Sequence, residues 1–252
     1  YGTDFFVPPC PGDLGSSIGA VNFGLLSQGK EPLFEMSPFL GPVADDLGSF
    51  QNLFECISLD EVMSTSTIME LLERDETIAI YSGRLEIGPR ALGARSLICN
   101  GDSKSAVEAL NEKRKKREPF RPVAPISNKD YLAEIIGPNM KLSPIFSWMG
   151  AVIGVADPEG IGNPSCLHHD STIRVQTLMD KIDQNEPPAY ELLEGLLKKF
   201  NFVGNTSFNI AGDPMVFQAE DVYINLHRLG LNYVYNHGSL YKTKDVYAIS
   251  AN

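Results

Sequence analysis

The amino-acid sequence predicts an α/β protein built on a mixed sheet that is flanked by helices. Apolar runs typical of buried strands alternate with segments of helical periodicity, and some predicted strands follow one another directly. Hydrophobic side chains make up 43% of the 252 residues and charged ones 21%, which are proportions typical of a folded globular protein. The chain is long enough for one large domain or two modest ones.

Helices are predicted where apolar side chains recur at helical spacing after a capping residue. These segments lie within residues 11–29, 59–75, 102–117, 129–136, 188–200 and 218–230. Residues that cap or stop a helix set the predicted ends, with caps at Ser16, Asp60, Asp102 and Asn128 and stops at Pro119, Pro122 and Gly230.

Strands are predicted where β-branched and aromatic residues form continuous or alternating apolar runs. They lie within residues 77–81, 96–100, 122–127, 145–156, 171–178 and 202–210, with a short strand end over 4–9. Segment 145–156 is predicted as a strand because it is rich in Ile, Val, Phe and Trp. Residues 232–236 and 239–243 are predicted to form a hairpin around His237 and Gly238.

A break in the pattern divides the chain into two predicted parts. Residues 31–55 are rich in Pro, Gly and Asp and show little periodicity, as a linker does. We predict that residues 1–48 are the C-terminal end of another domain plus the linker, and that residues 49–252 form the main domain. The first part is too short to bury a core alone. Because the chain begins at Tyr1, we expect a fragment or a processed product.

Charge is distributed unevenly along the chain. The net charge of −11 disfavours nucleic acid as a partner. Residues from Arg84 to Arg121 nevertheless carry a local charge of +5, against −16 for the rest. Such an electropositive island indicates a small anionic ligand rather than a long polyanion.

The sequence gives no sign of a membrane or secreted protein. No apolar run reaches the ~20 residues that a membrane helix needs, and no signal pattern opens the chain. The cysteines lie far apart, without zinc-ligand or CxxC spacing, at Cys10, Cys56, Cys99 and Cys166. We therefore expect reduced thiols and a cytoplasmic protein.

Segment 82–96 places Arg84, Arg90 and Arg95 in a glycine-rich loop after a predicted strand. Guanidinium groups offer paired donors that match a phosphate, and glycines let the backbone approach a ligand. The alternative is that Glu86 and other carboxylates pair with these arginines as surface ion pairs. The residues alone favour neither interpretation.

The basic segment 111–122 has three interpretations. It can be the solvated end of a helix, or a nuclear-import or nucleic-acid patch. In the third, Lys115, Arg117 and Arg121 join the arginine loop in one anion site. Two prolines stiffen this segment, which favours a fixed site over a mobile tail.

Two further segments carry polar side chains suited to binding. If the stretch after residue 167 is extended, alternate side chains share one face, namely His168, Asp170, Thr172 and Arg174. Ser207 and Asn209 also share a face where a strand enters a loop, and could bind phosphate or ribose oxygens. A structural histidine and an ordinary turn are the alternatives.

Four sequence blocks carry a resemblance to a known family. "GRLEIGPRALGARSL", "NEKRKKREPFRPVAP", "HHDSTIRVQ" and "NTSFNIAGDPMV" occur in this order within residues 83–222. Together they closely resemble the C-terminal domain of the NodU/CmcH-type O-carbamoyltransferases. "VPPCPGDLGSSIGA" near the start resembles the last strand and helix of that family's N-terminal, ASKHA-type domain.

The resemblance implies a fold and a reaction. The fold is a YrdC-like twisted mixed sheet flanked by helices, preceded by a remnant of the ASKHA-type domain. The reaction forms carbamoyl-adenylate from ATP, with Mg²⁺, and carbamoyl phosphate. The N-terminal domain of the same enzyme then passes the carbamoyl group to a hydroxyl of a small-molecule acceptor. That N-terminal domain is implied to hold a metal, with Fe²⁺ as the candidate, and to interact with this one.

The resemblance also implies roles for individual residues. Residues implied at the reacting centre are Lys115, Arg117, Arg90 and His168. Residues implied to bind the nucleotide and its phosphates are Arg84, Arg95, Arg121, Arg174, Ser207 and Asn209. Asp13 matches a metal ligand whose partner histidines this chain lacks. Ser171 stands where the family has glycine, and Arg114 where it has an aliphatic residue.

Two other functions are compatible with parts of this pattern. A free-standing threonylcarbamoyl-adenylate synthase acting in tRNA modification would share the fold, but residues 1–48 and the acidic balance argue against it. A non-catalytic module that binds RNA or another anion through "KRKKR" would bind RNA in a strongly salt-dependent way and form no adenylate.

Overall fold

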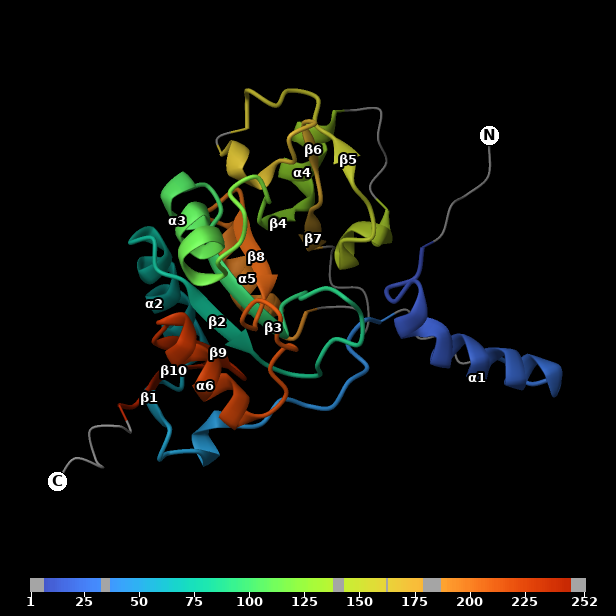
Figure 1. The fold of residues 1–252 in the computed structure, drawn as a ribbon, viewed down its shortest axis with the longest axis horizontal. Coiled ribbons are helices and arrows are strands. Elements are labelled where there is room, and N and C mark those ends of the chain that lie inside the picture. Colours follow the sequence, from blue (N-terminus) through green and yellow to red (C-terminus); the bar gives the residue numbers. More distant parts are fainter. Residues whose placement is uncertain (1–6, 33–36, 138–142, 162, 179–186, 246–252) are drawn as a thin grey trace.

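The computed structural model describes residues 7–32, 37–137, 143–161, 163–178 and 187–245. Its centre is an eight-stranded sheet in the order β1-β10-β9-β2-β3-β8-β4-β7 (Figure 1). The strands are β1 (Phe54–Ser58), β2 (Ile78–Tyr81), β3 (Arg95–Asn100), β4 (Ala124–Asn128), β7 (Gln176–Leu178), β8 (Val203–Ser207), β9 (Tyr233–Asn236) and β10 (Ser239–Thr243). Pairs β2/β9 and β4/β7 are parallel and the other neighbours antiparallel, which confirms the predicted mixed sheet. A second sheet pairs β5 (Ile153–Gly154) with β6 (Thr172–Ile173).

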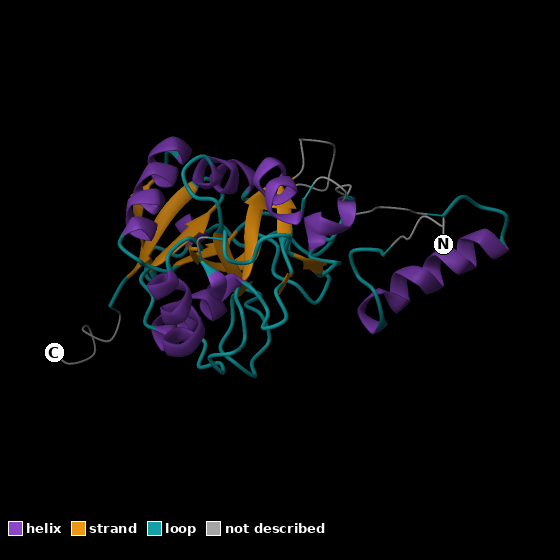
Figure 2. Cartoon of the chain, turned by 90° about the horizontal axis from the view of Figure 1, so that it is seen from above, coloured by secondary structure: helices purple, strands orange, loops and turns teal. Residues whose placement is uncertain are grey.

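Helices cover both faces of the large sheet (Figure 2). They are α2 (Glu61–Glu73), α3 (Lys104–Glu108), α4 (Lys129–Ile136), α5 (Tyr190–Leu197) and α6 (Ala219–Leu229), whereas α1 (Ser16–Ser27) covers neither face. Short 3₁₀ turns occupy Asp13–Gly15, Leu47–Ser49, Pro144–Trp148 and Pro164–Cys166, and π-helical turns at Ala109–Arg114 extend α3.

The alternation of side chains along the strands builds two cores. In β2, Ile78 and Ile80 pack with α2 and α5 on one face. Ala79 and Tyr81 point to the opposite face, where they join side chains of α3 and α6. The continuous apolar run of this strand is therefore explained by burial on both sides, as predicted.

Several predicted element ends are confirmed by side-chain contacts. Asp60 accepts a hydrogen bond from Met63 N at 2.8 Å and caps α2. Asn128 caps α4 through Tyr131 N, also at 2.8 Å. Gly230 ends α6 in the left-handed conformation, and the predicted C-terminal hairpin is formed by β9 and β10.

Other predicted elements were wrong in detail. Segment 145–156 is mostly a 3₁₀ turn and loop, with only β5 extended, because a proline at the first helical position favours a turn there. The predicted strand 171–178 is divided between the small sheet and the large one. The cap of α3 is Ser103, since Asp102 instead accepts the backbone N–H groups of the two residues just before β8.

The N-terminal part contains one further difference. Helix α1 begins at Ser16, but Gly15 occupies the cap position and no side-chain hydrogen bond caps it. The helix has no buried residue and stands apart from the sheet in Figures 1 and 2. The predicted strand end at 4–9 lies partly outside the described residues, and residues 7–9 form no strand. Whether residues 1–48 belong to another domain stays a prediction.

The segment before β1 nevertheless packs on the main sheet. Leu47 is fully buried, and its N–H donates to Asn236 Oδ1 at 3.0 Å. Asn236 Nδ2 donates to the carbonyls of Asp45 at 3.0 Å and Tyr81 at 2.6 Å. One buried amide therefore joins this segment to β2 and β9.

Replacing that amide should be costly. We expect Asn236→Ala to lower the free energy of unfolding by about 3 kcal/mol, because it leaves a buried N–H and two carbonyls without a partner. Urea denaturation followed by circular dichroism measures this. Asn232→Ala, at an exposed position of the same segment, is the matched control and should change stability by less than about 0.5 kcal/mol. Equal losses in both variants would contradict the assignment.

Candidate active site: a pocket lined by arginines

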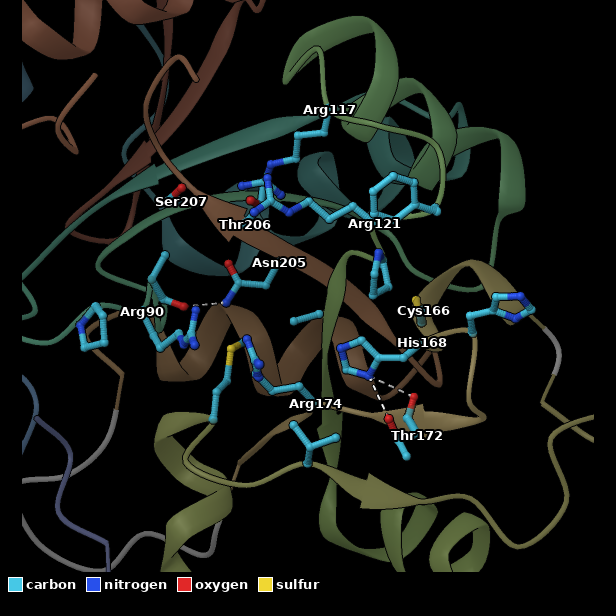
Figure 3. Close-up of a pocket in the computed structure, with 18 of the residues that line it drawn as sticks. Arg90, Arg117, Arg121, Cys166, His168, Thr172, Arg174, Asn205, Thr206 and Ser207 are labelled. Atoms are coloured by element: carbon cyan, nitrogen blue, oxygen red, sulfur yellow. Dashed lines mark hydrogen bonds between the residues drawn. The ribbon is translucent and has the colours of Figure 1, made fainter. Parts of the chain in front are cut away.

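A cavity of about 840 Å³ opens beside the ends of β8 and β4. Its charged and polar wall comes from four separate parts of the chain, and Figure 3 shows most of these side chains facing the same space. The wall includes Arg90, Arg117, Arg121, Cys166, His168, His169, Asp170, Thr172, Arg174, Asn205, Thr206 and Ser207. Four guanidinium groups thus converge on one cavity with a single carboxylate.

The four arginines form two groups. Arg117 and Arg121 lie beside Thr206 and Ser207, whereas Arg90 and Arg174 lie beyond Asn205 (Figure 3). Burial, and then the charge of Arg174, lowers the pKa of Arg90. Burial, and then Arg121, lowers the pKa of Arg117. Neighbouring positive charges repel one another, and a bound anion would offset this repulsion. The electrostatics of the pocket therefore favour an anionic ligand.

A buried ion pair shapes the loop that presents Arg90. The Glu86 side chain is fully buried and its Oε2 accepts Arg95 Nε at 3.1 Å. Its Oε1 accepts the N–H groups of Leu92 at 2.8 Å, Ala94 at 2.9 Å and Arg95 at 3.2 Å. The Arg95 guanidinium also donates to the carbonyl of Glu86.

The two other arginines of this loop were wrongly predicted to face phosphate. Arg95 pairs with the buried Glu86 behind the pocket, and Arg84 donates to the carbonyls of Phe39 at 3.3 Å and Leu40 at 3.2 Å. Neither lines the pocket. The ion-pair alternative was correct for Arg95, although the pair is buried rather than on the surface.

Lys115 lies behind the pocket rather than in its wall. It is 1% exposed, and its Nζ donates to Ser207 O at 2.8 Å, Asn209 O at 2.5 Å and Asn209 Oδ1 at 2.7 Å. An ammonium has three donors, so all of them are used. Burial, and then the charge of Arg117, lowers the pKa of Lys115 to about 7. The structure therefore shows Lys115 bonded to Ser207 and Asn209, at the end of β8, rather than directed into the cavity as predicted.

Asn209 was also expected to reach the ligand. It is instead held by Lys115, by the hydroxyl of Ser207 at 2.7 Å and through its Nδ2 to Asp213 O at 2.5 Å. Strand β8 ends at Ser207, so the alternation that would have placed Asn209 on the same face stops there. The residue that shares this face is Asn205, which sequence reasoning missed although it lies two positions before Ser207.

Asn205 connects the arginine loop to the sheet. Its Nδ2 donates to Ala91 O at 2.9 Å and to Gln176 Oε1 at 3.2 Å. Gln176 Nε2 in turn donates to Leu92 O at 2.8 Å. The loop around Arg90 is therefore fixed by two sets of contacts. Glu86 binds its N–H groups, and the side-chain amides of Asn205 and Gln176 bind its carbonyls.

The loop of Arg117 and Arg121 is fixed by a buried asparagine. Asn111 Nδ2 donates to Arg121 O at 2.7 Å, and Asn111 O accepts the N–H of Arg117 at 3.0 Å. A turn closes between Glu118 O and the N–H of Arg121 at 3.0 Å. The prediction that this segment forms a fixed site rather than a floppy tail agrees with these contacts.

His168 begins a tight turn rather than an extended strand. Its Nδ1 lies 3.1 Å from Thr172 O and 3.0 Å from Thr172 Oγ1, while the Thr172 hydroxyl donates to Asp170 Oδ1 at 2.7 Å. Since a carbonyl only accepts, Nδ1 carries a proton and Nε2 is left for a ligand. Ser171 has a φ of 61°, a conformation that favours glycine, at the position where the resembled family has one.

Comparison with known proteins gives the family. The family model described as "Carbamoyltransferase C-terminus" matches residues 69–242, which include every residue that lines the pocket. The chain belongs to the carbamoyltransferase C-terminus family. This confirms the family resemblance read from the four sequence blocks.

Relatives of this carbamoyltransferase domain carry informative names. "Nodulation protein U" of Azorhizobium caulinodans is 32% identical over 83% of this chain and 35% of its own length. "3'-hydroxymethylcephem-O-carbamoyltransferase" of Streptomyces clavuligerus is 28% identical over 86% of this chain and 40% of its own length. The chain thus spans 35% and 40% of the length of these two curated relatives.

Among solved structures, P. abyssi Sua5 complexed with L-threonine superimposes with a TM-score of 0.50 at 15% identity. The match covers 72% of this chain and 48% of that one. At this identity the likeness shows the fold alone, and it confirms the predicted YrdC-like α/β architecture. It does not bear on the predicted ASKHA remnant.

The carbamoyltransferase domain offers no metal centre within the described residues. Asp13 lies exposed in the 3₁₀ turn before α1, and no three His, Cys, Asp or Glu side chains of that part of the chain gather closely enough to hold an ion. In the same residues no helix is both long and apolar enough to cross a membrane. A metal role for Asp13 stays a prediction about the longer enzyme.

The ion pair inside the arginine loop can be tested directly. We expect Glu86→Gln to lower the free energy of unfolding by about 3–5 kcal/mol, because it leaves the buried Arg95 without its counter-charge. Glu194→Gln, which alters an exposed pair with Lys198, should cost less than about 0.5 kcal/mol. Both are measured by urea denaturation, and a small effect at Glu86 would show that the pair is dispensable.

Proposed function

We propose that this chain forms carbamoyl-adenylate from ATP and carbamoyl phosphate, and that the carbamoyl group then passes to a hydroxyl of a small-molecule acceptor. The observation that carries the proposal is the convergence of Arg90, Arg117, Arg121 and Arg174 on one cavity in a carbamoyltransferase domain. The chain spans well under half of the length of its curated relatives. We therefore assign the transfer of the carbamoyl group to the acceptor to the remaining part of a longer enzyme.

Atom balance defines what the pocket must do. Carbamoyl phosphate loses inorganic phosphate with uptake of water and leaves carbamate. A carbamate oxygen then attacks the α-phosphorus of ATP, the bond to the β-phosphate breaks, and pyrophosphate leaves. No side-chain nucleophile is needed, so catalysis consists of positioning two anions and stabilising the charge that develops.

The residues divide this work in a way that follows from their positions. Arg117 and Arg121, next to Ser207, are suited to hold the leaving pyrophosphate. Arg90 and Arg174 are suited to neutralise the carbamate and the α-phosphate. His168 Nε2 can accept a proton from the water that attacks carbamoyl phosphate.

Magnesium would accompany the triphosphate and neutralise part of its charge. The cavity wall contains one carboxylate, Asp170, which already accepts from the hydroxyl and the N–H of Thr172. The side chains therefore fit an ion held mainly by phosphate oxygens and water. Fe²⁺ as the metal of an N-terminal domain and the cytoplasmic location both remain predictions.

Product analysis tests the proposal. The chain is incubated with ATP and Mg²⁺, together with either carbamoyl phosphate or threonine plus bicarbonate, and adenylates are identified by mass. We expect pyrophosphate release and carbamoyl-adenylate with carbamoyl phosphate only. A threonine-dependent adenylate would support the synthase of tRNA modification instead. RNA binding that falls steeply with salt, without any adenylate, would support the non-catalytic module.

Removing one pocket arginine should slow the reaction strongly. We expect Arg117→Ala to reduce carbamoyl-phosphate-dependent pyrophosphate release by about 100-fold or more, because a charge-stabilising donor is lost from a partly buried site. Arg74→Ala, at an exposed position after α2, is the control and should keep the rate within about twofold. A rate that falls equally in both variants would contradict the assignment.

The lowered pKa of Lys115 predicts a proton linkage. Because the pKa of Lys115 is lowered to about 7, part of the Lys115 population lacks its third proton at pH 8 in the free protein. A bound triphosphate favours the charged form, so ATP binding at pH 8 should take up a fraction of a proton. Calorimetry of ATP binding in buffers of different ionisation enthalpy measures this number. Lys115→Met should abolish the uptake, whereas uptake that persists in the variant would assign it to another group.

The same shift affects stability in a defined direction. The pKa of Lys115 is lower in the folded than in the unfolded chain, so the unfolded state binds more protons between about pH 7 and the usual lysine range. This residue therefore contributes stability that rises with pH across that window. Urea denaturation measures the free energy of unfolding of wild type and of Lys115→Met at each pH. The value for wild type minus that for the variant should decrease as the pH falls through this window.

A further inference from the structure

The loop that carries Arg90 is paired with a segment that precedes β1. Residues 38–44 run antiparallel to residues 83–87, with Val43 opposite Arg84. Their backbone hydrogen bonds join Ala44 N to Gly83 O at 2.7 Å, Leu85 N to Pro42 O at 2.9 Å, Gly41 N to Leu85 O at 2.9 Å and Ile87 N to Pro38 O at 2.9 Å. The last of these bonds lies three residues before Arg90. Segment 38–44 therefore holds the backbone that leads into Arg90.

The side chain of Arg84 adds a second connection between the two segments. Its Nε donates to Phe39 O at 3.3 Å, and its Nη2 donates to Leu40 O at 3.2 Å. Hydrogen bonds from a charged donor are stronger than those between neutral groups. The Glu86 carboxylate makes its backbone contacts later in the loop, beyond Arg90. Arg90 thus lies between two attachments, one to segment 38–44 and one to Glu86.

Phe39 connects segment 38–44 to the wall of the arginine-lined pocket. It is 6% exposed and belongs to a small hydrophobic core with Leu92, Ala94, Trp148 and Met149. Met149 lines the pocket, and Leu92 follows Arg90 in the loop. None of residues 38–44, which the structure describes in full, lines the pocket. Any effect of this segment on a ligand must therefore pass through residues of the wall.

Arg90 needs this support because its neighbour repels it. Arg174 lies beside it in the pocket (Figure 3), and burial, then the charge of Arg174, lowers the pKa of Arg90. Two like charges move apart when the backbone allows it, since separation reduces their repulsion. Gly88 and Gly93 flank Arg90 and give its loop that freedom. Attachment on both sides of Arg90 keeps its guanidinium directed into the pocket before an anion binds.

We propose that segment 38–44 is a positioning element of the arginine-lined pocket, and that Arg84 and Phe39 support anion binding by holding Arg90 in place. Neither is a catalytic residue, because neither lines the pocket. The inference rests on the proposed function for the identity of the anion, which is carbamoyl phosphate. It assigns to the site a segment that the sequence predicts to be part of a linker.

A double-mutant cycle tests whether Arg84 acts through Arg90. Calorimetry measures the binding of carbamoyl phosphate to wild type, Arg84→Ala, Arg90→Ala and the double variant. We expect Arg84→Ala to weaken binding by about fivefold in the wild-type background, but by less than about twofold when Arg90→Ala is already present. The rate of carbamoyl-phosphate-dependent pyrophosphate release, which is measurable over a wider range, provides a second cycle with the same expectation.

Phe39→Ala tests the other connection. It should show the same coupling to Arg90→Ala, although its unfolding midpoint will fall because a buried ring is removed. Arg84 is exposed, so the midpoint of Arg84→Ala should stay close to that of wild type, which excludes loss of the fold as the cause of weaker binding. Arg74→Ala, at an exposed position after α2, is the matched control and should alter neither binding nor rate.

The outcomes separate this inference from the function on which it rests. A loss from Arg84→Ala that persists undiminished beside Arg90→Ala would show that Arg84 acts through its charge alone. That result, or no loss at all, overturns the positioning role, while binding of carbamoyl phosphate by wild type leaves the proposed function standing. If wild type neither binds carbamoyl phosphate nor releases pyrophosphate, the proposed function itself fails.

Discussion

The arrangement of the pocket depends on one buried carboxylate. Glu86 accepts three backbone N–H groups and the guanidinium of Arg95, from the loop that follows β2 and from the first residue of β3. A loop with several glycines can adopt many conformations. A fully buried carboxylate is stable only in a conformation that gives it hydrogen-bond donors and a counter-charge. This pair therefore selects a single loop conformation, and Arg90 is presented to the cavity as a consequence.

The remaining cations are placed by groups that never touch the ligand space themselves. Lys115 uses its three donors on the exit of β8, and Asn111 fixes the turn that carries Arg117 and Arg121. The fold holds Arg90, Arg117 and Lys115 in partly desolvated positions, and this burial lowers the pKa of each group. Such an arrangement stores electrostatic free energy that an anion releases when it binds, which raises affinity without further contacts.

Local signals in the sequence predicted local structure well. Helix ends could be predicted because each depends on a few neighbouring residues. The caps at Asp60 and Asn128 and the stop at Gly230 are examples. The two faces of the sheet followed from apolar periodicity. Segment 145–156 was misread because an apolar run without clear period fits a strand or a buried turn equally, and only tertiary packing decides.

The sequence indicated which types of residue form the site, but not which individual side chains face the cavity. Arg84, Arg90 and Arg95 are the same residue type in one loop region. Their separation into an anchor, a pocket residue and an internal counter-ion depends on partners elsewhere in the chain, such as Phe39 O for Arg84 and the Glu86 carboxylate for Arg95. Asn205 was overlooked because its binding partners, Ala91 and Gln176, lie far along the chain.

The π-helical turns at Ala109–Arg114 hold the cations of the next segment in register. Such a turn accommodates one residue more than an α-helix does, and each residue corresponds to a rotation of about 100° about the axis. If this stretch were a regular α-helix, the segment after it would be rotated about the helix axis. Lys115 would then point away from β8, and the arginines that follow it would change direction as well. The number of residues in a single helical turn, rather than any contact with the ligand, thus decides the direction in which the basic segment faces.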